Sequence, residues 1–193
     1  MAIKAIIFDC FGVLVTSSEF KLKHDYPQST TQIDDIRHQF DYALISLQQF
    51  KDSLAKLLGL TADDVDSRYL KASVHDDAAV KWVRELKESG QYKTGTLSNV
   101  GHGIFEYFFD SSAQKELFDA VVLSCDVGMA KPDIMIFGLI AKRLGVSTSE
   151  CVMIDDMPIN IDAALNAGMQ GIVFIPTDQA QDELRRLLES DRA

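Results

Sequence analysis

Cysteine is scarce in this sequence, and no stretch is apolar enough to suggest a membrane span. The three cysteines, Cys10, Cys125 and Cys151, show no CxxC spacing, and their odd number favours reduced, buried thiols over a disulfide framework. No uninterrupted apolar run approaches the roughly 20 residues that a membrane-spanning helix needs. The apolar start of the chain contains Asp9 and lacks a small-residue cleavage site, so we expect no signal peptide and a cytoplasmic protein.

Basic residues are also in deficit. The sequence has 19 lysine and arginine residues against 29 aspartate and glutamate residues, giving a formal net charge of -10. Proteins that bind nucleic acid or anionic membranes usually present a basic face, so we expect neither partner. A small anionic substrate remains compatible with this charge, because one metal ion and one lysine can reverse the field within a site. The composition leaves a monomer and a homodimer equally open.

The residues that are present suit a folded domain of the α/β class. Apolar residues make up 47% and charged residues 25% of the 193 residues, which is enough to bury a core without a disulfide or a structural metal. Several short runs rich in valine and isoleucine are typical of strands buried on both faces of a parallel sheet. These runs are residues 2–8, 93–97, 120–124, 151–154 and 171–175.

Helical patterns alternate with these strands. They cover residues 78–88, 101–114, 133–144, 158–167 and 178–188. The alternation predicts a doubly wound, Rossmann-like fold, with a parallel five-stranded sheet and right-handed crossovers.

Residues 16–74 interrupt the alternation. They contain no strand-like run, whereas Ile33, Ile36 and Phe40 recur at helical spacing, and Thr61 before two aspartates is typical of a helix start. We therefore predict a core domain of residues 1–15 plus 76–193 and an inserted α-helical domain of residues 16–75.

Polar motifs stand at strand ends or in the loops that follow, where open α/β sheets bind their ligands. An aspartate at the end of an apolar strand, followed by a glycine turn, is unusual for structure alone. Two adjacent carboxylates end a second strand. The motifs are Phe8-Asp9-Cys10-Phe11-Gly12, Leu97-Ser98-Asn99, Gly128-Met129-Ala130-Lys131-Pro132-Asp133 and Ile154-Asp155-Asp156-Met157-Pro158-Ile159-Asn160.

Together and in this order, the four motifs resemble the signature of the haloacid dehalogenase (HAD)-like hydrolase superfamily. The inserted helices lie where that family inserts its helical cap. Each motif alone is weak: Asp9 would be read as a turn residue or helix cap, Ser98 and Asp155 as helix caps, and Lys131 as a solvated loop lysine. Within the family, the chain resembles the helical-cap phosphatases, including sugar-phosphate phosphatases and the N-terminal phosphatase domain of epoxide hydrolase.

The resemblance implies a Mg²⁺-dependent phosphatase that acts on a small phosphorylated metabolite. Asp9 would attack phosphorus and form an aspartyl-phosphate intermediate. Mg²⁺ prefers oxygen ligands, which would be the carboxylates of Asp9 and Asp156 and the backbone carbonyl of Phe11. The metal ion would neutralise charge in the transition state.

The remaining motif residues would bind the phosphate or support the site. Ser98 would donate a hydrogen bond to a phosphate oxygen, with the backbone N–H of Asn99 in the same cradle, and Lys131 would provide a fixed positive charge. Asp155 would orient Lys131 or a metal-bound water, and Asn160 would support these groups from behind.

The chain departs from the family at position 11. Family phosphatases usually carry a second aspartate there as general acid and base, and losing such a group typically costs roughly 10²–10⁴ in rate. We therefore expect either a substrate with a good leaving group, such as an anomeric sugar phosphate, or a substitute acid from the cap. The sequence does not choose between candidates such as His24 and Asp25.

Two alternatives stay open. Family dehalogenases carry an aromatic residue two positions after the nucleophile, as Phe11 is here, which suggests a carbon–halogen hydrolase. Those enzymes lack the metal-binding carboxylate, so Asp156 argues against this assignment. The second alternative is a catalytically weak module that binds a phosphorylated ligand.

Overall fold

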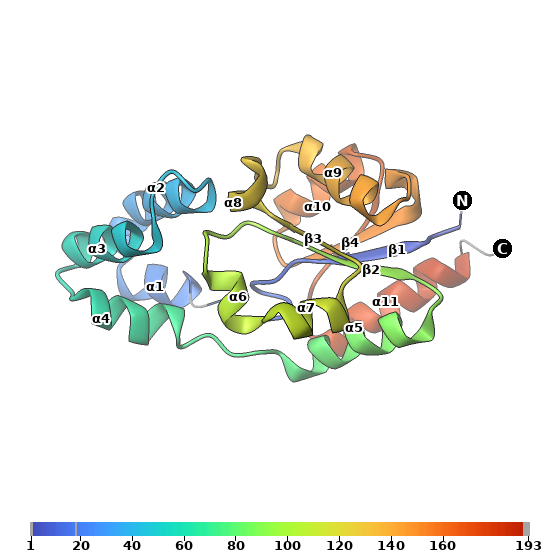
Figure 1. Cartoon of the computed structure of the whole chain (residues 1–193), viewed down its shortest axis with the longest axis horizontal. Coiled ribbons are helices and arrows are strands. Elements are labelled where there is room, and N and C mark those ends of the chain that lie inside the picture. Colours follow the sequence, from blue (N-terminus) through green and yellow to red (C-terminus); the bar gives the residue numbers. More distant parts are fainter. Residues whose placement is uncertain (1, 18, 191–193) are drawn as a thin grey trace.

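A five-stranded parallel sheet forms the centre of the protein, as seen in the computed structural model, which describes residues 2–17 and 19–190 (Figure 1). Its strand order is β3-β2-β1-β4-β5, and every neighbouring pair is parallel. This confirms the predicted doubly wound α/β fold. The strands are β1 (Ala5–Phe8), β2 (Lys93–Ser98), β3 (Ala120–Leu123), β4 (Cys151–Asp155) and β5 (Gln170–Val173).

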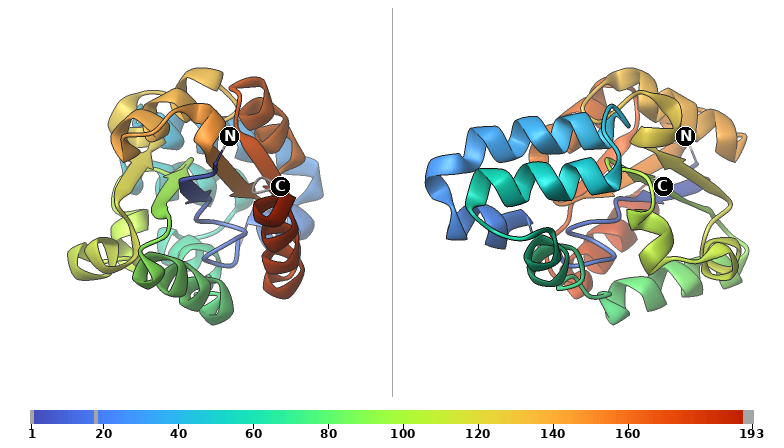
Figure 2. Two further views of the ribbon diagram at one scale, coloured as in Figure 1. Left: turned by 90° about the vertical axis from the view of Figure 1, so that its right-hand side faces the viewer. Right: turned by 60° about the vertical axis from the view of Figure 1, so that its left-hand side comes forward.

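Helices cover both faces of the sheet (Figure 2). Ile6 and Phe8 of β1 pack into one apolar cluster and Ala5 and Ile7 into another, because successive side chains of a strand point to opposite faces. The first cluster lies under α5 (Asp77–Ser89) and α11 (Thr177–Ser190), and the second lies under α9 (Ile134–Leu144) and α10 (Pro158–Asn166).

The strand order creates a switch point between β1 and its two neighbours. Phe8 of β1 is in register with Thr96 of β2 and with Ile154 of β4. From β1 the chain runs outward through β2 to β3, and it then returns past β1 to form β4 and β5 on the other side. A crevice therefore opens at the carboxyl ends of β1 and β4. Asp9, which donates its backbone N–H to Ile154 O at 2.9 Å, lies at this crevice.

The single helix predicted for residues 101–114 is wrong. The chain forms two short helices, α6 (Ile104–Phe108) and α7 (Ser111–Leu117). Asp110 separates them, because its side chain accepts hydrogen bonds from the backbone N–H groups of Ser112 and Ala113 and so starts a new helix.

The strand boundaries differ from the predicted ones by up to three residues. β1 begins at Ala5 rather than residue 2, and β3 ends one residue early because a short helix, α8 (Ser124–Val127), follows directly. β2 and β4 each extend one residue further and include Ser98 and Asp155. A 3-10 turn, Thr148–Glu150, leads into β4.

The helices between β1 and α5 pack around an apolar cluster of their own, and Figure 1 shows them beyond the carboxyl ends of the strands. Thr61 caps one of these helices, as predicted from the sequence. The division into a core of residues 1–15 plus 76–193 and a cap of residues 16–75 stays a prediction. The cap helices are α1 (Glu19–Asp25), a 3-10 turn (Pro27–Ser29), α2 (Thr30–Asp41), α3 (Leu47–Leu58), α4 (Ala62–Val65) and a π-helical turn (Asp66–Leu70).

Hydrogen bonds join the two segments that connect the cap to the core. The backbone N–H of Thr16 donates to Val74 O at 2.8 Å, and the N–H of Val74 donates to the Thr16 hydroxyl at 3.0 Å. A second contact lies at the far end of α2, where the Ser124 hydroxyl donates to the backbone oxygen of Asp41 at 2.7 Å. The cap is therefore attached to the core on two sides of the crevice.

Within the described residues, no helix has the length and apolar character required to cross a bilayer.

Candidate active site

Three buried charged side chains meet at the carboxyl ends of β1 and β4. The Lys131 ammonium lies 2.9 Å from Asp9 Oδ2 and 2.6 Å from Asp155 Oδ2. The lysine side chain is only 1% exposed, so its charge is largely removed from water and depends on these two carboxylates for compensation. Residues from three separate segments thus form one ionic cluster.

Asp155 is fully engaged by protein donors. Its Oδ1 accepts hydrogen bonds from the backbone N–H of Met157 and from the Asn160 side chain, both at 2.9 Å, while Oδ2 accepts from Lys131 and from Asn160. These contacts fix the carboxylate behind Lys131. Asp155 is fully buried and does not line the cavity, so it positions the lysine from below.

Asn99 fastens the loop that carries Lys131. Its side-chain amide donates to Lys131 O and accepts from Lys131 N–H, both at 2.8 Å. Neighbouring Ser98 is 1% exposed, and its hydroxyl has no hydrogen-bond partner among the described residues. A buried hydroxyl normally has a partner, so the Ser98 hydroxyl has unused hydrogen-bonding capacity, although Ser98 does not line the cavity.

The acidic groups fit a divalent cation. Asp9, Asp155 and Asp156 each have a carboxylate oxygen within 4.8 Å of the others. Asp9 and Asp156 line the cavity and Asp155 does not, so Asp9 and Asp156 are the carboxylates that a metal ion in the cavity can reach.

Gly12 makes room for this arrangement. Its φ is +90°, and a Cβ added there would lie closer than 3.0 Å to the Asp156 carboxylate. Only glycine combines this backbone conformation with so close an approach. The turn after β1 therefore holds Asp156 toward the end of that strand.

Burial dominates the electrostatics of the cluster. It raises the pKa of Asp9 to about 7, although the charge of Lys131 acts in the opposite direction. Burial and then the charge of Asp155 raise the pKa of Asp156. Burial alone would lower the pKa of Lys131, but the two adjacent carboxylates more than offset it and raise that pKa. A cation between Asp9 and Asp156 would favour their charged forms.

Phe11 places an aromatic ring where family phosphatases carry an acid. The ring lines the cavity and packs edge-to-face against Phe108, with ring centroids 5.7 Å apart. The two substitutes considered from the sequence do not line the cavity. The side chain of His24 is 89% exposed, and Asp25 accepts a hydrogen bond from the Tyr69 hydroxyl.

The sequence prediction missed Asp41. This cap aspartate is buried, lines the cavity together with Asp9, and pairs with Arg37 at 3.5 Å. Burial raises its pKa to about 6 against the effect of Arg37 and Lys131. Its only sequence signal is the i,i+4 spacing from Arg37, which is common on solvent-exposed helices.

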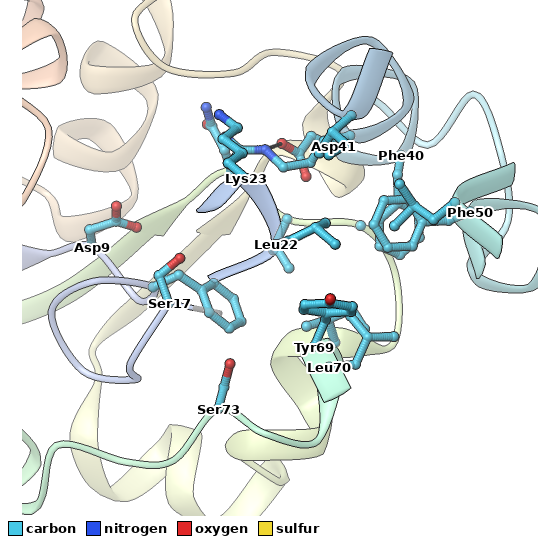
Figure 3. Close-up of a pocket in the computed structure, with 18 of the residues that line it drawn as sticks. Asp9, Ser17, Leu22, Lys23, Phe40, Asp41, Phe50, Tyr69, Leu70 and Ser73 are labelled. Carbon is cyan, nitrogen blue, oxygen red and sulfur yellow. Dashed lines mark ion pairs between the residues drawn. The ribbon is translucent and has the colours of Figure 1, made fainter. Parts of the chain in front are cut away.

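A cavity of about 240 Å³ extends from the cluster into the cap. Figure 3 shows Asp9 at one end and Leu22, Phe40, Phe50 and Tyr69 gathered at the other. The predicted residues Phe11, Asn99, Lys131, Asp156 and Asn160 also line it.

Comparison with protein families agrees with this geometry. The family described as haloacid dehalogenase-like hydrolases matches residues 3–168. The chain belongs to this family. It is therefore a hydrolase, and the resemblance stated from the four motifs is confirmed.

Relatives of this HAD-like hydrolase include named phosphatases. It is 28% identical to phosphatase MT3486 of Mycobacterium tuberculosis (strain CDC 1551 / Oshkosh) over 208 residues, covering 98% of this chain and 95% of that protein. It is 26% identical to sesquiterpene phosphatase astK of Aspergillus oryzae over 193 residues, covering 96% of each. It is 26% identical to drimenol cyclase drtB of Aspergillus calidoustus over 161 residues, and this match covers 81% of the chain but 30% of the cyclase.

Solved structures share the fold of this HAD-like hydrolase. A HAD family enzyme of Bacteroides thetaiotaomicron, solved as a magnesium complex, superposes with a TM-score of 0.74 at 22% identity, covering 90% of this chain and 94% of that one.

Proposed function

We propose that the protein is a Mg²⁺-dependent phosphatase that hydrolyses a small phosphate monoester through an aspartyl-phosphate on Asp9. The observation that carries the proposal is the convergence of Asp9, Lys131 and Asp156 at the ends of adjacent strands. Two carboxylates for a cation and one buried ammonium for a phosphate are the groups that this reaction requires. The phosphatase names of two relatives and the magnesium complex of a structural neighbour support it.

Mg²⁺ bound by Asp9, Asp156 and the backbone carbonyl of Phe11 would reduce the repulsion between the anionic phosphate and the anionic nucleophile. Asp9 attacks phosphorus, and the bond from phosphorus to the ester oxygen breaks. Lys131, held by Asp155, keeps a positive charge against the transferring group. The free hydroxyl of Ser98 donates a hydrogen bond to a phosphate oxygen, and Asn99 holds the lysine loop in place. Asn160 keeps Asp155 aligned.

Water then attacks phosphorus in the aspartyl-phosphate and releases inorganic phosphate, which regenerates the Asp9 carboxylate. Closure of the cap over the crevice would exclude bulk water during the first step. The expectations of a monomer or homodimer without a nucleic-acid or membrane partner, located in the cytoplasm, remain part of this proposal.

A carbon–halogen hydrolase is the second candidate. The chain is 26% identical to an (S)-2-haloacid dehalogenase of Pseudomonas putida over 203 residues. The aromatic residue Phe11 stands two positions after the proposed nucleophile, Asp9. Asp156 favours the phosphatase, because dehalogenation by an aspartate needs no second carboxylate for a metal ion. A weak phosphate-binding module, the third candidate, would accumulate the aspartyl-phosphate without turnover.

The test is a hydrolysis screen with and without Mg²⁺ on wild-type protein and on Asp156→Ala. We expect wild-type protein to hydrolyse p-nitrophenyl phosphate and some metabolite phosphates only with Mg²⁺, and Asp156→Ala to lose this dependence together with at least about 99% of the activity. Asp162→Ala, an exposed aspartate on α10, is the matched control and should behave as wild type. Release of halide from 2-chloropropionate without metal would replace the phosphatase assignment by the dehalogenase.

A further inference from the structure

The wall of the cavity opposite Asp9 is apolar and comes from the whole cap. Side chains from α1, α2, α3 and α4 line it, and their residues are at most 7% exposed. The rings of Phe40 and Phe50 are stacked there with centroids 4.4 Å apart. Water finds few hydrogen-bond partners beside such an apolar wall, so the wall is suited to a hydrocarbon group. The lining residues of this apolar wall are Leu22, Ile33, Phe40, Phe50, Leu54 and Val65.

This apolar wall continues to the reacting group. Phe11 and Phe108 line the cavity beside Asp9, and Ile104 lies between them and the cap cluster. Gly101 allows a close approach of core and cap, because a Cβ there would lie closer than 3.0 Å to the Phe40 ring. An apolar path therefore runs from the nucleophile to the far end of the cavity.

Polar side chains of the cap also line the cavity, and at least four of them have protein partners. The six polar residues are Ser17, Lys23, Arg37, Asp41, Tyr69 and Ser73. Arg37 pairs with Asp41, Lys23 pairs with Asp34 at 2.5 Å, and the Tyr69 hydroxyl donates to Asp25 at 3.2 Å. Each hydroxyl of a bound sugar would need a hydrogen bond to offset its loss of water. Hydrogen bonds from the cap to a sugar would compete with these existing pairs, whereas a hydrocarbon group on the apolar wall needs none. The cavity therefore favours a hydrocarbon group over the sugar phosphate expected from the sequence.

We propose that the substrate is a phosphate monoester of a small apolar alcohol, whose hydrocarbon chain fills the cap cavity while its phosphate lies at Asp9 and Lys131. This inference rests on the proposed phosphatase function and names its substrate class. A volume of about 240 Å³ lies just below the roughly 300–1,000 Å³ of pockets for drug-sized ligands, so the alcohol is small.

The test measures binding separately from turnover. Alkylphosphonates of two to ten carbons, whose C–P bond is not hydrolysed, are titrated by calorimetry into wild-type protein with Mg²⁺. We expect binding to tighten about two- to fourfold for each added methylene until the cavity is full, with an increasingly negative heat-capacity change. A terminal hydroxyl on the hexyl compound should weaken binding by about tenfold or more.

Two variants test where the alkyl chain of the ligand binds. Phe50→Leu enlarges the far end of the cavity, and the chain length of tightest binding should move to longer chains. Leu44→Ala, at an exposed cap leucine outside the cavity, should leave the series unchanged. The inference would be overturned if affinity were independent of alkyl chain length. It would also be overturned if the hydroxyhexyl compound bound as tightly as the unsubstituted hexyl compound. If affinity rises with chain length but no phosphate ester is hydrolysed, the apolar site stands and the phosphatase fails.

A separate observation concerns the missing acid. Asp41 is the cap carboxylate that lines the cavity with Asp9, and its burial distinguishes it from the other acidic residues of α2. Its backbone oxygen is held by Ser124 of the core, 2.7 Å away. Asp41 and Lys131 line the same cavity, so the Asp41 carboxyl shares this space with the proposed phosphate site. The alkoxide of an apolar alcohol is a poor leaving group and needs a proton.

The geometry points to Asp41 as the proton donor that replaces the acid absent at position 11. As Asp9 forms its bond to phosphorus and the bond to the alkoxide oxygen breaks, the Asp41 carboxyl gives its proton to that oxygen. The products are the neutral alcohol, phospho-Asp9 and the Asp41 carboxylate. The water that later hydrolyses phospho-Asp9 supplies the replacement proton.

Leaving-group dependence tests this role, since kcat/KM reports only the steps through departure of the alcohol. In Asp41→Asn we expect kcat/KM for hexyl phosphate to fall by roughly 10²–10³, but for p-nitrophenyl phosphate, whose leaving group needs no proton, by less than about threefold. Asp41→Glu should restore part of the activity on hexyl phosphate. Asp35→Asn on the exposed face of α2 is the matched control.

Equal losses on both substrates in Asp41→Asn would show that the residue only holds the cap in place, and the proposal would fail. Arg37→Gln adds a second check. If it reproduces the selective loss on hexyl phosphate, the ion pair rather than the proton of Asp41 is responsible.

Discussion

Replacing Asp9 by asparagine should abolish phosphate release while the protein stays folded. Asparagine has nearly the same shape but its amide oxygen is a far weaker nucleophile, so we expect kcat to fall by roughly 10⁴-fold or more. The backbone N–H of Cys10, which donates to Asp9 Oδ1 at 2.6 Å, keeps an acceptor in the variant. Lys131 keeps Asp155 as its partner.

The measurement is single-turnover hydrolysis of p-nitrophenyl phosphate, with circular dichroism and thermal unfolding to confirm the fold. Brief acid quenching should trap an acid-stable, hydroxylamine-sensitive phosphoenzyme in wild-type protein and none in Asp9→Asn. Asp110→Asn, which changes a helix cap outside the site, controls for the loss of a carboxylate. Turnover by Asp9→Asn near the wild-type rate would exclude Asp9 as the nucleophile.

Replacing Lys131 by methionine should damage both stability and catalysis. The substitution leaves Asp9 and Asp155 buried without their shared cation, and removing one partner from such a cluster typically lowers the free energy of unfolding by about 3–5 kcal/mol. Denaturant unfolding in the presence of EDTA measures this loss. The matched exposed variant is Lys81→Met, whose lysine lies on the surface of α5 and should change stability by less than about 1 kcal/mol.

The loss of stability in Lys131→Met should increase with pH. Burial already holds the pKa of Asp9 at about 7, above its value of 3.8 in an unfolded chain, and removing Lys131 raises it further. The folded variant then binds a proton more tightly than the unfolded chain, so its stability falls as pH rises from about 4 through the raised pKa. We expect a smaller deficit at pH 5 than at pH 8. The double variant Asp9→Asn/Lys131→Met should recover part of the deficit at pH 8, and no recovery would contradict the ionic cluster.

Residues near the strand ends were predictable because the backbone determines their position. Asp9 directly follows β1, while Ser98 and Asp155 end β2 and β4. Parallel strands bring their carboxyl ends to one edge. Lys131 was predicted through its loop motif, although its double ion pair depends on a fold that brings positions 9 and 155 together. No local pattern in the sequence predicts the order β3-β2-β1-β4-β5.

Cap residues were not predictable in the same way. Asp41 follows Phe40 on α2 and acquires its burial only when that helix packs against α8 of the core. The break at Asp110 was missed because Phe105, Phe108 and Phe109 of α6 and its C-cap, followed by Ala113 of α7, give one apolar pattern at helical spacing. In both places tertiary packing decided the outcome over the local sequence.

The paired connecting segments at Thr16 and Val74 have a consequence for how such proteins diversify. Because the chain leaves the sheet and returns to it at one point, everything between these residues is topologically a single loop. Insertion, deletion or exchange of that loop need not disturb the pairing of any strand. Selection can therefore change which molecules are admitted without touching the nucleophile, the buried lysine or the paired carboxylates of the core.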